Sequence, residues 1–478
     1  MTNKKNILYI MSDQHRYDAV SCHGNNVCQT PNIDWLAQHG VDFENCYTVN
    51  ALCSPARGTV MTGLYPHNHG QLANTGNFNR VFDTQILSKK SYPHMLQECG
   101  YYTGIAGKWH LPLEKDCGHW GYDKWYGEWD YFDALREKGI EYERGKDGVQ
   151  PIEWGGSATF CGPSPLSAQD SMETWVTDHV IDMIREAADE KKPFMINCHY
   201  FAPHFPYSVP KPYDTMYAPE QIEKWANFDD MYVNKPTVQQ KEMLRWNASH
   251  LTWKDWQKAI AAYYGYCTYM DHEIGRLITY LREHDLLKDT MVIYTSDHGD
   301  MLGSHRAFNK GMNMYEETHR IPFIACCEGW IKENTVCDKF VNLADVMPTF
   351  LDIAGAQSPE NLDGVSLLPL MTDENAENWR EDIMCEFHGY EPALCTIRMV
   401  RTKKWKYIYN PCSEDELYDM ESDPGELHNL APMLAFKHVL RRMKERMVYW
   451  LNKTGDSIVE EDSWKSTSYD LYISRREQ

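Results

Sequence analysis

Short apolar runs recur along this chain, and each is followed by a cluster of polar residues and then by a segment with helical spacing. This alternation is typical of a mostly parallel β-sheet covered by helices. The runs with the length and composition of buried strands are residues 7–11, 102–106, 194–198, 291–295 and 322–326. Residues 253–283 carry apolar side chains at three- and four-residue spacing, which predicts one long helix. The expected fold class is therefore α/β, with a mostly parallel central sheet flanked by helices.

The pattern changes after about residue 370. Residues 373–382 are polar and acidic, which is typical of a linker. Beyond them we expect three short strands and a helix, at residues 383–387, 396–402, 405–409 and 432–450. We therefore predict two units, a catalytic α/β domain over residues 1–372 and a smaller C-terminal α+β unit over 383–478. The second should hold an antiparallel sheet with a helix packed on it.

The composition excludes several classes of partner. The formal net charge of −22 argues against nucleic acid, whose phosphates need a basic surface, and it disfavours long polyanionic polymers. No run approaches the roughly 18–20 apolar residues that span a bilayer, and the first apolar run is too short for a signal-peptide core. We therefore expect a cytoplasmic protein without a membrane partner. The 15 cysteines lack paired spacing and are expected to be reduced thiols.

Chemically active side chains follow four of the predicted strands, either directly or within a few residues. Because the carboxyl ends of parallel strands share one edge of a sheet, these groups should converge in a single cleft. They are Asp13 and Gln14, Lys108 and His110, His204, and Asp297 and His298.

A candidate metal site consists of Asp13, Gln14, Asp297 and His298. Two carboxylates and an amide oxygen suit a hard cation, and we expect Ca²⁺, with Mg²⁺ as an alternative. The imidazole widens the choice toward Mn²⁺ or Zn²⁺. A single acidic pair is more often an ordinary strand end or helix N-cap, and it is the repetition of the pattern after two strands that favours a metal.

The most specific segment of the chain is LCSPARGTVMTG, residues 52–63. Pro55 suits the first turn of a helix, and Ser54 is the expected N-cap. Cys53 would then lie at the positive end of the helix dipole, where a thiol has a lowered pKa and can serve as a nucleophile. A small buried thiol before a helix has the same pattern.

The C-x-P-x-R frame from Cys53 to Arg57, followed by Thr62-Gly63, resembles the signature of the sulfatase family. Other blocks that look like this family occur in family order: Gly107-Lys108-Trp109-His110, Pro203-His204, Ser296-Asp297-His298-Gly299-Asp300, Leu302-Gly303-Ser304-His305, Asn309-Lys310-Gly311, and Glu416-Leu417-Tyr418-Asp419 with Asp423-Pro424 and Glu426. The resemblance runs from residue 7 to about residue 430. It implies an alkaline phosphatase-like fold and a metal-dependent hydrolase of sulfate monoesters.

The resemblance also implies roles for the matched residues. A maturation enzyme would oxidise Cys53 to formylglycine, and one hydroxyl of the hydrated aldehyde would attack sulfur. Arg57 would steady the modified residue, and the metal would lower the hydroxyl pKa and bind the ester oxygens. Lys108 and Lys310 would neutralise the sulfate oxygens as charge develops.

Three matched histidines receive roles in the same way. His204 would protonate the leaving oxygen, and His110 would act as a base on the hydrate and reopen the aldehyde. His305 would contact the substrate. Lone histidines are usually structural, and outside the matched blocks we keep that interpretation.

Two positions depart from the family pattern. Gln14 stands where many sulfatases have a second Asp, and Ala56 stands where many have Ser. The combination of Asp13-Gln14 with Asp297-His298 resembles the phosphonate monoester hydrolases and phosphodiesterases of the same superfamily, which also use a formylglycine. Phosphonate or phosphodiester hydrolysis is therefore the alternative function. A non-catalytic protein that binds metal or glycan is a more remote one.

The expected substrate is a small molecule or a short oligosaccharide that carries a sulfate ester. Residues 119–132 hold three tryptophans and three tyrosines among acidic residues, which would suit an aromatic wall for a sugar or aryl group. Packing in the core is an equally good explanation, because tryptophan is usually mostly buried. The acidic net charge favours a monosaccharide, a short oligosaccharide or an aryl sulfate over a long chain.

Overall fold

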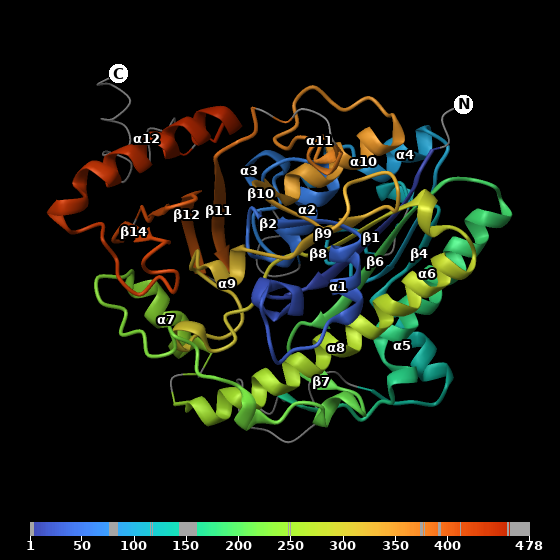
Figure 1. Cartoon of the computed structure of the whole chain (residues 1–478), viewed down its shortest axis with the longest axis horizontal. Helices are drawn as coiled ribbons and strands as arrows, with labels where there is room; N and C mark the ends of the chain where they lie inside the picture. The colour runs from blue at the N-terminus through green and yellow to red at the C-terminus, as the bar shows by residue number, and fades with distance from the viewer. Residues whose placement is uncertain are drawn as a thin grey trace.

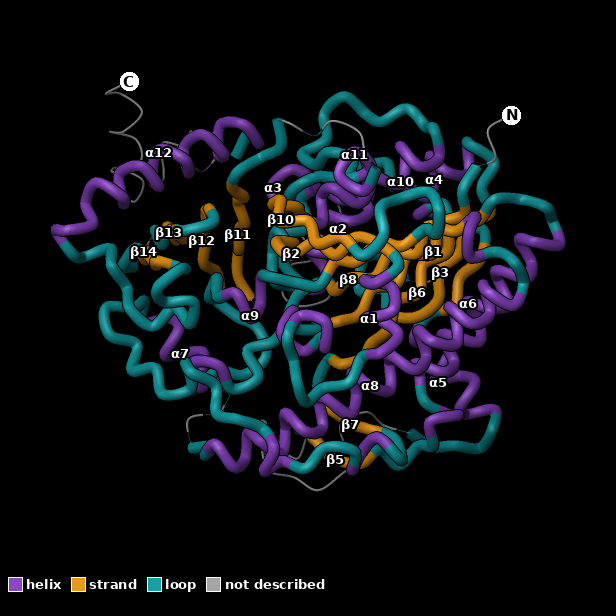
Figure 2. The backbone as a smooth tube through the Cα atoms, in the orientation of Figure 1, coloured by secondary structure: helices purple, strands orange, loops and turns teal. Residues whose placement is uncertain are grey.

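An eight-stranded sheet runs through the larger part of the molecule (Figures 1 and 2). The computed structural model describes residues 4–458 except 76–84, 115, 117, 143–159, 247, 249, 373–375, 377, 391–392, 412 and 457. In spatial order the strands are β10 (Thr335–Asn342), β2 (Gly40–Tyr47), β9 (Phe323–Cys326), β8 (Thr290–Ser296), β1 (Asn6–Asp13), β6 (Phe194–Pro203), β3 (Tyr102–Gly107) and β4 (Lys124–Tyr126). All neighbours are parallel except the two pairs that contain β9. The mostly parallel α/β fold is confirmed.

Helices cover both faces of this sheet. The sequence of β1 shows why both faces must be covered. Ile7, Tyr9 and Met11 point into one apolar core, whereas Leu8 and Ile10 point into the other. A continuous apolar run is what a strand buried on both faces needs. The first core is closed by α2 (Cys53–Thr62), α4 (Tyr92–Glu98), α10 (Val346–Ala354) and α11 (Leu368–Met371), and the second by α1 (Pro31–Gln38), α5 (Glu128–Glu137), α6 (Met172–Asp189) and α8 (Trp253–Glu283).

The predicted strands lie in β1, β3, β6, β8 and β9, and the long predicted helix is α8. Strand β6 continues to Pro203, beyond the predicted end at residue 198, so that His204 follows the strand directly. The sequence pattern did not reveal β2, β4 and β10. The first half of β10 is mostly exposed and mixes apolar with polar side chains, and it forms a strand because its backbone pairs in parallel with β2.

The carboxyl ends of β8, β1, β6 and β3 lie next to one another. Ser12 of β1 pairs with Ser296 of β8, and Met11 pairs with His199 of β6. His199 in turn pairs with Gly107 at the end of β3. The residues that follow these strands therefore emerge at the same edge of the sheet, as the sequence predicts.

A second, antiparallel sheet follows near the end of the chain. Its strands are β11 (Asp382–Tyr390), β12 (Ala393–Thr402), β13 (Trp405–Tyr409) and β14 (Glu416–Asp419), and α12 (Lys437–Thr454) packs on one face. Side chains of the other face, such as Cys385 and Met399, belong to one buried cluster with Phe308 of the larger part. The expected antiparallel sheet and helix are confirmed, with β14 added and the helix shifted toward the C-terminus. The division at residues 372 and 383 stays a prediction, and residues 373–375, 377 and 459–478 lie outside the described residues.

The remaining elements are short. They are α3 (Pro66–His69), α7 (Thr237–Arg245), α9 (Glu316–His319) and the two-stranded ribbon of β5 (Cys161–Pro163) and β7 (Tyr207–Val209). No helix in the described ranges is long and apolar enough to cross a membrane.

A buried ion pair ties the second sheet to the segment after α2. In α3, Nδ1 of His67 lies 2.5 Å from Oε2 of Glu386 in β11, and the His67 backbone N–H donates to Oε1 at 2.9 Å. Burial alone would lower the pKa of His67, but Glu386 and then Asp456 raise it to about 9. His67 is therefore an imidazolium at neutral pH, paired with a carboxylate that has no access to solvent.

We expect His67→Gln to lower the melting temperature most below about pH 6.5 and progressively less as the pH rises through about 9. A raised pKa in the folded state stabilises the protein fully below the unfolded-state pKa, and this contribution is lost above the folded-state pKa. It amounts to at most about 3 kcal/mol. Thermal unfolding of both proteins across this pH range measures the difference. A difference between them that does not vary with pH would contradict the assignment.

Candidate active site

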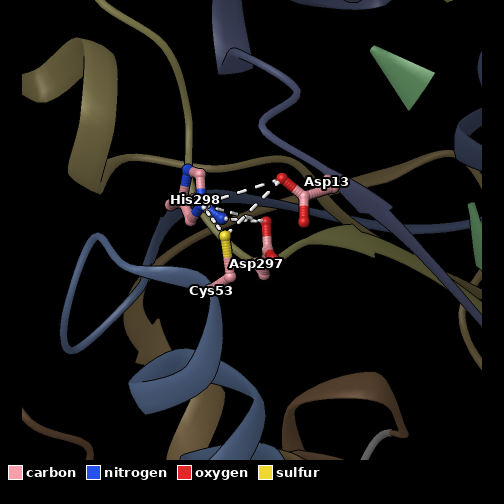
Figure 3. Close-up of side chains that lie close together, drawn as sticks. All are labelled: Asp13, Cys53, Asp297 and His298. Atoms are coloured by element: carbon pink, nitrogen blue, oxygen red, sulfur yellow. Dashed lines mark hydrogen bonds and ion pairs between the residues drawn. The ribbon is translucent and has the colours of Figure 1, made fainter. Parts of the chain in front are cut away.

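The Cys53 side chain is buried at the start of α2, beside the ends of β1 and β8 (Figure 3). Its Sγ lies 3.3 Å from Nε2 of His298, 3.8 Å from Nζ of Lys108 and 3.9 Å from Oδ1 of Asp13. As predicted, the thiol lies at a helix N-terminus, where the dipole favours negative charge. The predicted N-cap is wrong, because the helix begins at Cys53 and the Ser54 hydroxyl is used elsewhere. It donates to the His110 carbonyl at 2.6 Å.

Arg57 lies one turn beyond Cys53 and joins two buried carboxylates. Its Nη2 is 3.0 Å from Oδ2 of Asp13 and 2.9 Å from Oδ2 of Asp297. Nζ of Lys108 is 2.6 Å from the same Asp13 oxygen. These cations hold the outer oxygens of the two carboxylates. The inner Oδ1 atoms are left facing Nε2 of His298, at 3.8 Å from Asp13 and 3.6 Å from Asp297.

The side-chain amide of Gln14 has a defined orientation. Its Nε2 donates to Oδ2 of Asp300 at 2.6 Å, and the Tyr207 hydroxyl donates to the same oxygen at 2.5 Å. A carboxylate oxygen only accepts, so the amide nitrogen must lie on that side. The amide Oε1 consequently faces Nζ of Lys310, which donates to it at 2.9 Å. Gln14 also has a φ of 70°, a left-handed conformation that costs of the order of 1 kcal/mol and clusters at functional sites.

Three of the four predicted metal ligands, Asp13, Asp297 and His298, have donor atoms close enough to share a divalent cation. The Nδ1 of His298 donates to the Gly299 carbonyl at 2.9 Å, which directs the Nε2 lone pair toward the carboxylates. Donor atoms of Asp13, Cys53, Asp297 and His298 lie within 4.8 Å of one another. Apart from the Cys53 sulfur, these donors are two carboxylates and one imidazole nitrogen, and the Gln14 amide oxygen is directed to Lys310. This set suits Ca²⁺ or Mg²⁺, and it also accommodates Mn²⁺.

Opposing charges set the ionisation of this cluster. Burial alone would raise the pKa of Asp13, but Lys108 and its neighbouring cations hold it well below its usual range. Burial and the charge of Asp13 raise the pKa of Asp297 to about 6. For Cys53, burial and Asp13 raise the pKa, and Lys108, Lys310 and His298 together outweigh them and lower it well below that of a free thiol. The position therefore favours a deprotonated, nucleophilic group.

Lys310 and His204 form a pair on the opposite side of Gln14. Nζ of Lys310 donates to Nε2 of His204 at 3.2 Å, and Nδ1 of His204 donates to the Phe205 carbonyl at 2.5 Å. Burial, followed by the charges of Lys310 and Lys108, lowers the pKa of His204 to about 3. His204 is therefore neutral at neutral pH in this state.

The position of Lys108 depends on a close contact between β3 and β6. The Lys108 backbone N–H donates to the His199 carbonyl at 2.9 Å, and Nδ1 of His199 donates to the Lys108 carbonyl at 3.1 Å. Gly107, with a φ of 103°, allows this approach, because a Cβ there would lie 1.9 Å from the His199 oxygen. His199 was missed from the sequence, since it lies inside an apolar strand and matches no motif. Tyr207 was missed for the same reason, and Asp300 was noticed only as part of a matched block.

The other two predicted histidines differ in their surroundings. His110 has a φ of 57°, and its buried Nδ1 has no hydrogen-bond partner within the described part of the chain. His305 is fully buried, with Nδ1 at 2.6 Å from Asp230 and Nε2 at 3.0 Å from the Asn227 amide. It stacks on Tyr315 at a centroid distance of 3.8 Å. Both ring nitrogens of His305 therefore have partners within the protein. The predicted contact of His305 with the substrate stays a prediction.

We expect Arg57→Met to destabilise the protein by about 3–5 kcal/mol, because it leaves two buried carboxylates without their shared cation. Excess Ca²⁺ should recover more of the melting temperature in this variant than in the parent, since a bound cation neutralises the same oxygens. Thermal unfolding with a chelator and with Ca²⁺ measures both effects. Arg185→Met, at a side chain that is 58% exposed, is the control. Equal losses in the two variants would contradict the interpretation.

Comparison with known proteins identifies the family. The family described as Sulfatase matches residues 5–356, and the one described as N-sulphoglucosamine sulphohydrolase, C-terminal, matches residues 303–453. An N-acetylglucosamine-6-O-sulfatase of Bacteroides thetaiotaomicron is 30% identical over 90% of this chain and 83% of its own length. An arylsulfatase of Clostridium perfringens is 30% identical over 93% of this chain and 94% of its own length.

Solved structures show the same fold. A protein solved in complex with its substrate D-glucosamine-2-N,6-O-disulfate superposes with a TM-score of 0.78 at 26% identity, over 96% of this chain and 100% of that one. A phosphonate monoester hydrolase of Agrobacterium radiobacter gives a TM-score of 0.80 at 24% identity, over 94% and 96% of the two chains. The family match spans well over half of the chain, and this chain is a member of the sulfatase family and a sulfuric ester hydrolase.

Proposed function

We propose that this protein hydrolyses sulfate monoesters of sugars or aryl alcohols, with an oxidised Cys53 as the nucleophile. The observation that carries the proposal is the surroundings of Cys53, which is buried at a helix N-terminus against Asp13, Lys108 and His298 in a chain of the sulfatase family. Oxidation of its thiol to an aldehyde by a maturation enzyme would supply formylglycine, whose hydrate offers an oxygen nucleophile in the same place.

The cation is proposed to be Ca²⁺, with Mg²⁺ and Mn²⁺ as alternatives. Asp13, Gln14, Asp297 and His298 would hold it, through the donor atoms that converge near Cys53. When bound, it would supply positive charge that lowers the pKa of the nucleophilic hydroxyl and offsets charge on the ester.

The remaining side chains provide charge and protons. Lys108 and Lys310 approach the Cys53 region from two sides, and both would neutralise the sulfate oxygens. His204 is the proposed acid for the leaving oxygen, and the negative charge of a bound sulfate would raise its low pKa toward the working range. His110 is the proposed base on the hydrate.

Hydrolysis of phosphonate monoesters or phosphodiesters is the second candidate. Gln14 is the observation that favours it, because a neutral amide occupies a position where a carboxylate would add negative charge. A less negative site changes the anion charge that it binds best.

Matched aryl esters distinguish the two candidates. We expect the protein, produced together with a maturation enzyme, to hydrolyse the aryl sulfate faster than the phosphonate monoester and the phosphate diester. Cys53→Ala should reduce the sulfatase rate at least about 10³-fold, because it removes the nucleophile. Mass spectrometry of the peptide containing residue 53 verifies the modification. A faster rate on the phosphorus esters would reject the first candidate in favour of the second.

A pocket of about 300 Å³ on the same edge of the sheet supports a sugar substrate. Trp109, Trp125 and Trp129 line it, together with Gly127 and the acidic residues Glu114, Glu128, Asp130 and Asp133. The aromatic residues of segment 119–132 thus fall into two groups. Trp120 and Tyr122 are buried in the core, whereas Trp129 is 52% exposed and lines the pocket. Aromatic faces with nearby carboxylates suit sugar rings and their hydroxyl groups. We propose short sulfated amino sugars as substrates.

We expect Trp129→Ala to raise the KM for N-acetylglucosamine 6-sulfate about 2- to 12-fold, equivalent to the roughly 0.5–1.5 kcal/mol of one aromatic contact. The KM for a small aryl sulfate should change less, because it has no sugar hydroxyl groups for the acidic residues of the pocket to bind. Tyr449→Ala, at another half-exposed aromatic side chain, is the control. Equal loss on both substrates, or a preference for long sulfated polymers, would contradict the proposed subsite.

A further inference from the structure

A second cluster of metal-ligating side chains lies outside the active site. Cys22 and His23 are adjacent in the 3₁₀ turn Ser21–His23, and Asp42 lies in β2. One donor atom from each of the three side chains lies within 4.8 Å of the others. The cluster shares no residue with the set around Cys53 and contains a different combination of ligands, one sulfur, one nitrogen and one carboxylate.

The His23 ring is held in the orientation that metal-binding histidines adopt. Its Nδ1 lies 2.9 Å from the Tyr17 carbonyl, and the ring stacks on Tyr17 at a centroid distance of 3.9 Å and an angle of 8°. A carbonyl only accepts, so Nδ1 carries the hydrogen. This contact fixes Nε2 as the nitrogen directed toward Asp42, as His298 is fixed by the Gly299 carbonyl in the active site.

Asp42 faces this nitrogen with both of its oxygens. Nε2 of His23 lies 3.1 Å from Oδ1 and 3.0 Å from Oδ2, and the two side chains are only 1% and 9% exposed. Within the described ranges, no other group donates a hydrogen bond to this carboxylate. With His23 neutral, a lone pair and a carboxylate would face each other, so the arrangement requires positive charge between them. That charge is either a proton on Nε2 or a metal ion.

The position of the Cys22 thiol is the observation that favours a metal ion over a proton. A proton alone would need only the imidazole and the carboxylate, whereas a third donor atom within 4.8 Å completes three sides of a coordination shell. Tetrahedral zinc places its ligand atoms about 3–4 Å apart, given bonds of about 2.0–2.3 Å. The His23–Asp42 distances of 3.0 and 3.1 Å lie at the lower end of this spacing and also match a hydrogen bond. Cys22 is exposed, so water can take the fourth position.

We propose that Cys22, His23 and Asp42 bind a divalent transition-metal ion, with Zn²⁺ as the expected occupant. Thiolate and imidazole ligands select borderline ions of this type over Ca²⁺ and Mg²⁺, which prefer oxygen. The thiol proton is released when the ion binds, and no electron transfer is involved. The ion would connect the segment that follows Gln14 to β2, and so would stabilise the chain next to the active site.

Cobalt titration of the Cys53→Ser protein tests this site without interference from the active-site thiol. A near-ultraviolet charge-transfer band reports a thiolate bound to Co²⁺, and the active site of this variant has no thiol to produce one. We expect the band to saturate at one Co²⁺ per chain and to disappear when Zn²⁺ is added. Zn²⁺ should also raise the melting temperature.

The band should be lost in Cys22→Ser and in Asp42→Asn, each made in the Cys53→Ser background. It should be retained in Cys99→Ser, at another cysteine that is not fully buried. Because Cys22 is exposed, its substitution does not threaten the fold, and sulfatase activity of Cys22→Ser alone should equal that of the parent. Absence of a thiolate band in Cys53→Ser, or a band that persists without Cys22, would overturn the proposal and leave His23 as an imidazolium paired with Asp42.

Discussion

The guanidinium of Arg57 between two buried carboxylates is the interaction on which the active site depends. Asp13 and Asp297 leave neighbouring parallel strands, and neither side chain has any access to solvent. Two such charges at one sheet edge repel each other, and Arg57 offsets the repulsion by bonding to one oxygen of each. Because Arg57 lies one helical turn beyond Cys53, the same contact fixes the start of α2 against the sheet. Arg57 therefore both pairs the two carboxylates and positions the nucleophile.

Because of this pairing, the outer and inner carboxylate oxygens of Asp13 and Asp297 have different partners. Cations of the protein hold the outer carboxylate oxygens, while the inner oxygens face the His298 nitrogen and the Gln14 amide oxygen faces Lys310. Asp300 and Tyr207 determine which end of the amide is presented. The neutral amide keeps the site less negative than three carboxylates would, which bears directly on the charge of the anion that is hydrolysed.

The smaller sheet contributes to the same site through the segment that carries Lys310. The neighbouring Asn309 donates to the Tyr390 hydroxyl of β11 at 3.2 Å, and Phe308 packs on Phe205 at a centroid distance of 5.0 Å. Phe205 in turn stacks on His204. Lys310 and His204 are thus held by contacts that reach from the end of β6 to the second sheet. This packing explains why matched motifs occur along most of the chain rather than in the first half alone.

Local patterns in the sequence were sufficient for the central strands and for the grouping of Asp13, Lys108 and Asp297, and the motif around Cys53 added the nucleophile. Apolar runs mark buried strands, and parallel strands must end at a common edge. Tertiary structure alone decided the role of Ser54, the orientation of Gln14, the burial of His305 and the inclusion of β2 and β10 in the sheet. Each of these depends on hydrogen bonds between residues far apart in the sequence, such as Gln14 to Asp300 and Ser54 to His110. Periodicity and motif spacing report on near neighbours and contain no information about such partners.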